Sequence, residues 1–116
     1  MGKGKISIGF SQLGVFRSPG LLDCSGYIEA RSDSARVFIA DSVVLNNGFS
    51  IIADRAEIYV GDRCLIGPNF FVCDSDFHGI SVADRVNGNY TCESVFIDSD
   101  VFIGEGVKVL KGAWIS

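Results

Sequence analysis

His78 is the side chain of this 116-residue sequence best suited to proton transfer, and it is the only histidine. It follows Asp74, Ser75, Asp76 and Phe77 in a polar segment. Histidine ordinarily accepts a proton near neutral pH and passes it on, as a general base must. Asp74 or Asp76 could accept a hydrogen bond from the ring N–H and fix its tautomer. The alternative is a surface histidine beside carboxylates that cap a turn.

Composition argues against several other functions. Four cysteines, at 24, 64, 73 and 92, are far apart, with no C-x-x-C pair and a single histidine, so we expect neither a metal site nor a dithiol. The net charge of −4 and a pI near 4.7 provide no basic stripe for nucleic acid. No segment resembles a signal peptide or is apolar over the length of a bilayer. We therefore expect a cytoplasmic protein without membrane insertion.

An Ile, Leu or Val recurs every sixth residue over much of the chain. A helix repeats near 3.6 residues and a strand near 2, so a period of six indicates short strands and turns stacked as a solenoid. The alternative is a β-sandwich or barrel of short strands with evenly spaced turns. The apolar anchors form three runs: Ile39, Leu45 and Ile51; Val60, Ile66 and Val72; and Ile97, Ile103, Val109 and Ile115.

Two breaks interrupt the period. The step from Ile51 to Val60 is nine residues, which predicts a bulge over residues 53–56. The step from Val72 to Ile97 is longer still and predicts a loop extruded over about residues 77–94. Insertions in repeat proteins map to loops that often carry the binding face. We expect one domain over residues 1–116, with an irregular N-terminal part over about 1–26.

The hexads resemble those of the hexapeptide-repeat acyltransferases, in particular the sugar, maltose and polysaccharide O-acetyltransferases. The resemblance covers about residues 27–116 and implies an all-β fold, a left-handed parallel β-helix. Its corners need positive φ, consistent with many Gly, Asn and Asp residues. Its handedness departs from the usual crossover rule. The hexads that carry it begin Val60-Gly61-Asp62, Ile66-Gly67-Pro68-Asn69, Ile97-Asp98-Ser99 and Ile103-Gly104-Glu105.

The resemblance also implies a function. In these enzymes a histidine shortly after an Ile-Gly-Pro-Asn hexad, where the loop leaves the coil, is the general base. His78 occupies that place after residues 66–69. The resemblance therefore implies an O-acetyltransferase that moves an acetyl group from acetyl-CoA to a hydroxyl of a sugar or polysaccharide precursor.

Binding residues follow from the same resemblance, each with a structural alternative. Asn47 would contact the acceptor or the acyl donor, or hold a corner at positive φ. Asp54 would bind acceptor hydroxyls, or be a solvated turn residue, and Asp76 would bind substrate or be a loop carboxylate. Arg85 would bind a sugar hydroxyl or acidic group, or be a surface charge. Lys108 and Lys111 would bind the phosphates of coenzyme A, or be ordinary exposed lysines.

The related enzymes are trimers, so we expect a homotrimer. They continue through further coils, so the chain should lack C-terminal coils, which puts acyl-donor binding in doubt. The outward-facing Trp114 is expected to cover another coil, a neighbouring subunit or that continuation. Two other functions compete. A zinc enzyme of the carbonic-anhydrase type would need three histidines, and this chain has one. A non-catalytic binding or assembly module remains the alternative.

Overall fold

The computed structural model describes residues 2–22 and 25–116, which form short strands and no helix. The strands lie in three parallel sheets: sheet A in the order β1-β4-β7-β10-β13, sheet B in the order β11-β8-β5-β2 and sheet C in the order β12-β9-β6-β3. Their bounds are β1 (Lys5–Ile8), β2 (Gln12–Leu13), β3 (Tyr27–Ala30), β4 (Arg36–Ile39), β5 (Val44–Leu45), β6 (Ser50–Ala53), β7 (Glu57–Val60), β8 (Leu65–Ile66), β9 (Phe71–Cys73), β10 (Val95–Ile97), β11 (Phe102–Ile103), β12 (Lys108–Val109) and β13 (Trp114–Ile115).

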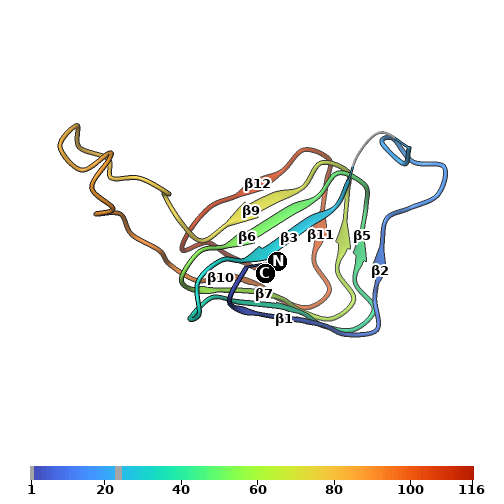
Figure 1. Cartoon of the computed structure of the whole chain (residues 1–116). Coiled ribbons are helices and arrows are strands. Elements are labelled where there is room, and N and C mark those ends of the chain that lie inside the picture. The colour runs from blue at the N-terminus through green and yellow to red at the C-terminus, as the bar shows by residue number, and fades with distance from the viewer. Residues whose placement is uncertain (1, 23–24) are drawn as a thin grey trace.

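Each coil adds one strand to each sheet in turn, so the chain winds a parallel β-helix. Viewed along its axis, the three sheets enclose a triangular interior (Figure 1). The left-handed parallel β-helix predicted from the hexads is confirmed, and the sandwich or barrel is not observed. Among the described residues, none forms a helix that could cross a membrane.

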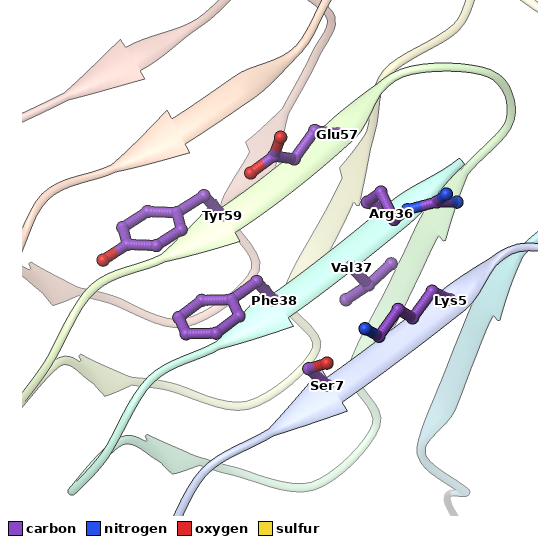
Figure 2. A pocket seen from close by; sticks show the side chains of 7 residues that line it. All are labelled: Lys5, Ser7, Arg36, Val37, Phe38, Glu57 and Tyr59. Atoms are coloured by element: carbon purple, nitrogen blue, oxygen red, sulfur yellow. The ribbon is translucent and has the colours of Figure 1, made fainter. Parts of the chain in front are cut away.

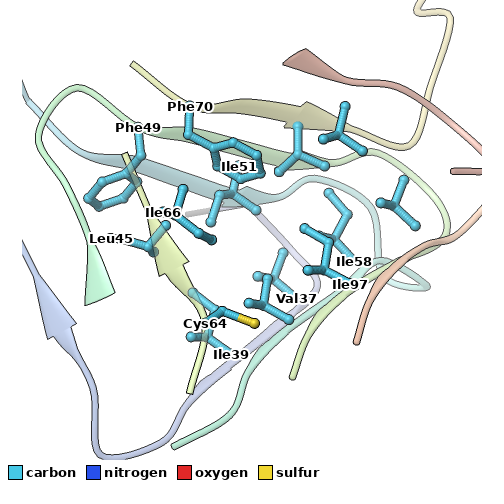
Figure 3. Packing of buried hydrophobic residues seen from close by; sticks show 14 of the residues in the cluster. Val37, Ile39, Leu45, Phe49, Ile51, Ile58, Cys64, Ile66, Phe70 and Ile97 are labelled. Atoms are coloured by element: carbon cyan, nitrogen blue, oxygen red, sulfur yellow. The ribbon is translucent and has the colours of Figure 1, made fainter. Parts of the chain in front are cut away.

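The hexad anchors stack in register on successive coils. Ile39 pairs with Val60, and Val60 pairs with Ile97. Equivalent columns run from Leu45 through Ile66 to Ile103 in sheet B and from Ile51 through Val72 to Val109 in sheet C. These side chains point inwards and form the core with residues four positions further along the chain (Figure 3). Of these, Cys64 is fully buried, as the sequence predicted.

Positive φ recurs at two stacked corners, and at the one between sheets A and B it falls on residues other than glycine. Ser42, Arg63 and Asp100 have φ of 60°, 57° and 63° there. Asp fits the expectation from the sequence, whereas Ser and Arg depart from it. The Arg63 guanidinium donates to Asp100 at 2.7 and 3.0 Å, linking two adjacent turns of this corner.

The N-terminal part is more regular than the sequence predicted. Residues 1–26 were expected to be irregular, but in the described part of this segment β1 pairs with β4 and β2 pairs with β5, so these two strands begin the first coil. Register places Ile8 beside Ile39, Leu13 beside Leu45 and Ile28 beside Ile51. The steps between these anchors are therefore five and fifteen residues, which hides the period of six. Among the described residues before β3, only the segment between β2 and β3, described over residues 14–22 and 25–26, leaves the coil.

Both predicted breaks lie where the chain passes from sheet C to sheet A. Residues 54–56 form the bend between β6 and β7. Residues 74–94 connect β9 to β10 and extend away from the triangular body as one loop (Figure 1). We call this edge the loop corner; it comprises residues 31–35, 54–56, 74–94 and 110–113.

Candidate functional site

Asp74 anchors the extruded loop to the β-helix. Its side chain is fully buried, yet its carboxylate has three backbone partners. Oδ1 accepts from the N–H of Asp54 at 2.7 Å, and Oδ2 accepts from Ala56 at 2.7 Å and Arg55 at 3.3 Å. A buried carboxylate needs such donors to offset its lost hydration. Asp74 therefore fixes the bend of the preceding coil beneath the loop.

Ser75 and Asp54 form a second buried contact at the loop corner. The Ser75 hydroxyl donates to Asp54 Oδ2 at 3.1 Å and accepts from the N–H of Phe77 at 2.8 Å. Asp54 is only 3% exposed, and the Cys92 thiol also lies 3.9 Å from its Oδ2. The structure thus brings Asp54 to the base of the loop, where it contacts the loop itself and is not a solvated turn residue.

The two ends of the loop run together as a short stem. The N–H of Glu93 donates to the carbonyl of Asp74 at 2.8 Å, and the N–H of Asp76 donates to that of Thr91 at 3.3 Å. Between these bonds, Ser75 and Cys92 form an antiparallel bridge. The stem sets where the loop leaves the body, and His78 follows directly after it.

Phe77, next to His78, has an uncommon backbone conformation. Its φ is +62°, which is strained for a bulky residue and is stabilised only by its surroundings. The Arg31 guanidinium lies 5.2 Å from the centroid of the Phe77 ring. Glu29 holds Arg31 through bonds of 3.0 and 3.1 Å, and the hydrogen bond from Arg31 is the main reason that the pKa of Glu29 lies below its ordinary value.

A second cation–π contact holds the returning side of the loop. The Arg55 guanidinium lies 4.1 Å from the centroid of the Tyr90 ring. Sequence analysis missed the positioning roles of Arg31, Arg55 and Ser75, because each acts on residues about 20 to 46 positions away. The only sequence signal for these contacts was the presence of Phe77 and Tyr90, since aromatic rings in a polar loop need a partner.

His78 is exposed, and the tautomer of its neutral ring follows from one contact. Nδ1 lies 2.9 Å from the carbonyl oxygen of Gly79. A carbonyl only accepts hydrogen bonds, so Nδ1 carries the proton and Nε2 presents the basic lone pair. The expected carboxylate partner is wrong for both candidates. Asp74 is bonded to backbone N–H groups, and Asp76 bonds Thr91 and Lys111.

The other predicted site residues in or near the loop corner differ in their contacts. Asp76 and Lys111, expected to bind different substrates, form an ion pair at 3.5 Å with both side chains 25% exposed. Arg85 is exposed within the loop. Lys108 is exposed on β12. Lys111 therefore links the loop to the last coil, whereas Arg85 and Lys108 are exposed to solvent.

Asn47 lies at a different corner, between β5 and β6. Its amide is 7% exposed and binds the segment that leaves the first coil. Oδ1 accepts from the N–H of Val15 at 3.0 Å, and Nδ2 donates to the carbonyls of Val15 at 2.9 Å and Pro19 at 3.3 Å. The predicted positive φ at Asn47 is wrong, since it is the next residue, Gly48, that has a φ of 78°. Asn47 has a structural role of another kind, through these hydrogen bonds.

Replacing Asn47 with Ala should release this N-terminal segment. The change removes three hydrogen bonds from a buried amide, so we expect a loss of roughly 1–3 kcal/mol in the free energy of unfolding. Hydrogen–deuterium exchange should increase over residues 15–22, while exchange in the 74–94 loop stays unchanged. Faster exchange at the loop instead would show that Asn47 supports the candidate site.

The thiols of the described residues are poorly suited to chemistry. Cys64, Cys73 and Cys92 are free, and burial is the main reason that the pKa of each thiol is raised. Cys24 lies outside the described residues. Within residues 2–22 and 25–116, no group of three His, Cys, Asp or Glu side chains could hold a metal ion.

Three curated O-acetyltransferases are similar to the chain. The galactoside O-acetyltransferase of Lactococcus lactis is 34% identical over 64 residues, which cover 55% of this chain and 30% of the relative. The polysialic acid O-acetyltransferase of Neisseria meningitidis is 27% identical over 93 residues, covering 78% and 37%, respectively. That of Escherichia coli O1:K1 is 25% identical over 79 residues, covering 67% and 25%.

These similarities confirm the resemblance to O-acetyltransferases. The chain spans only 25% to 37% of the length of these relatives. Neither a protein-family model nor a solved structure matches it.

Proposed function

We propose that this chain carries the general-base part of an O-acetyltransferase that moves an acetyl group from acetyl-CoA to a hydroxyl of a sugar or polysaccharide. The position of His78 carries the proposal: an exposed histidine, with its tautomer set by Gly79, on the loop of a hexad β-helix. The names of all three relatives support it, because each is an O-acetyltransferase acting on a galactoside or on polysialic acid.

His78 would act through Nε2. This atom removes the proton from the acceptor hydroxyl as the oxygen attacks the thioester carbonyl of acetyl-CoA. The tetrahedral intermediate then collapses, the C–S bond breaks, and the imidazolium returns the proton to the departing thiolate. The Nδ1–H bond to Gly79 would hold the ring in place, with Nε2 free to act, without requiring a carboxylate.

The remaining residues would contribute to binding in different ways. Asp76 and Arg85 would contact the acceptor at the loop, and Lys108 and Lys111 would meet the phosphates of coenzyme A. The buried Asp54 would act through Ser75, which holds the loop at its base. Asn47 is at another corner, so it would contact substrate only where subunits of the proposed homotrimer meet. We place this enzyme in the cytoplasm, where acetyl-CoA is made.

A non-catalytic binding module is the second candidate function. The observation that favours it is that neither Asp74 nor Asp76 bonds the His78 ring, so the described residues form no catalytic triad.

Incubation of the protein with acetyl-CoA and a galactoside or polysialic acid fragment should separate the two functions. We expect one thiol released for each acetyl group found on the sugar by mass spectrometry. The test uses the full reading frame that contains this chain. Sugar binding without any thiol release above the hydrolysis background would support the binding module and contradict the transferase.

A further inference from the structure

The outer face of sheet A carries a continuous row of aromatic rings. Register places Phe38 beside Tyr59, Tyr59 beside Phe96 and Phe96 beside Trp114. The Phe38 and Tyr59 rings are stacked with their centroids 5.1 Å apart and their planes at 1°, and the next two pairs are tilted at 6.4 Å. Each inner ring therefore has a ring neighbour on both sides.

The row stops at β1, where Ser7 takes the position next to Phe38. A serine side chain is too short to cover the ring, so the Phe38 face turned away from Tyr59 has no aromatic partner among the described residues. Two hollows of about 390 and 350 Å³ open at this point, and Ser7, Phe38 and Tyr59 line both of them. The missing ring thus leaves space for a flat group beside Phe38.

Charged side chains surround the larger hollow. Lys5, Arg36 and Glu57 line it together with Phe38 and Tyr59 (Figure 2). Lys5 makes no ion pair with any described residue, and the Arg36 guanidinium donates only to the carbonyls of residues 33 and 35. The hollow therefore offers two cationic groups without carboxylate partners.

The larger hollow also lies close to the loop corner. Lys5, Arg36 and Glu57 are the first residues of β1, β4 and β7. β4 and β7 begin where the chain turns from sheet C into sheet A, and β1 pairs with β4 at the same edge. The extruded loop leaves this edge at a later coil (Figure 1). A chain-like ligand that contacts the loop could extend along this edge to the hollow.

We propose that this hollow is a subsite for one acidic sugar unit of an oligosaccharide acceptor. The C–H face of a pyranose would stack on Phe38, and its carboxylate would bind Lys5 and Arg36. The identity of the ligand as an acceptor rests on the proposed function. Binding at the subsite does not, since it needs neither acetyl-CoA nor His78.

A sugar fits this surface better than a second protein chain. Protein interfaces are depleted of charge at their centre. Here three charged side chains line the hollow beside Phe38, which is 40% exposed. Sugar sites, by contrast, combine a ring face with charged or polar groups that fix orientation.

Calorimetric titration with a short polysialic acid fragment, without acetyl-CoA, tests the subsite. We expect saturable binding that Phe38→Ala weakens about tenfold, the loss of one stacking contact. Ser7→Phe completes the aromatic row and should abolish binding while the fold is kept. Lys5→Gln should weaken binding of the acidic fragment and reduce its salt dependence. The matched control is Phe102→Ala, which removes a ring that is 77% exposed on sheet B and should change nothing.

Three outcomes would overturn the proposal. One is the absence of saturable binding, and another is equal affinity in the Ser7→Phe and unmodified proteins. The third is a change of molecular mass in light scattering with Phe38→Ala, which would show that a second copy covers this face. If the subsite is absent but acetyl transfer occurs, the proposed function stands alone; if the fragment binds but no transfer occurs, only the subsite stands.

Discussion

Replacing His78 with Ala should lower the turnover number for acetyl transfer by roughly 10²–10⁴-fold, the usual contribution of a general base. The affinity for acetyl-CoA should change little, because no contact of the His78 side chain supports the coil that carries Lys108. Steady-state kinetics at saturating concentrations of both substrates provides the measurement.

The same variant should remain folded. His78 is exposed, and its ring bonds only the adjacent residue, so the free energy of unfolding should stay within about 0.5 kcal/mol of the original. Full turnover in a folded His78→Ala protein would remove His78 from the mechanism.

Asp74→Ala should be among the most destabilising single changes in the chain. The substitution leaves the N–H groups of residues 54, 55 and 56 without their buried acceptor, and the expected cost is roughly 3–5 kcal/mol in the free energy of unfolding. Urea denaturation followed by circular dichroism measures it. Hydrogen exchange over residues 74–94 should also become faster, because the loop loses its anchor.

Asp33→Ala is the matched control for this prediction. Asp33 is an exposed carboxylate at the same corner, two coils earlier, and its removal should cost no more than about 0.5 kcal/mol. Equal effects of the two changes would contradict the anchoring role of Asp74.

The coils were predictable wherever the anchors keep a step of six. From Ile39 onwards, the inward side chains repeat along the sequence and stack in space, so the sequence period and the register agree. The first coil was missed because its steps of five and fifteen residues give no local period. Ile8 and Leu13 belong to that coil only through their pairing with β4 and β5.

The candidate site was predictable in place but not in its contacts. The long break in the period located the loop, and the lone histidine within that break located the site. The partners of Asp74 could not be deduced, because the N–H groups that it accepts from belong to the preceding coil, 18 to 20 residues earlier. Proximity in sequence to His78 suggested a catalytic carboxylate, whereas the structure shows an anchor. Similarly, the Asn47 side chain bonds Val15, which lies 32 residues earlier, and no pattern in the sequence predicts this contact.

Chemical rescue of His78→Ala by imidazole tests the general-base role most directly. Because His78 is exposed, a free imidazole molecule can approach the vacated position and accept the hydroxyl proton. We expect the acetyl-transfer rate of the variant to rise in proportion to imidazole concentration, with no change in the unmodified enzyme. If the folded variant gains no activity from imidazole, or is as active as the unmodified enzyme without it, the proton is accepted elsewhere and the proposed mechanism is contradicted.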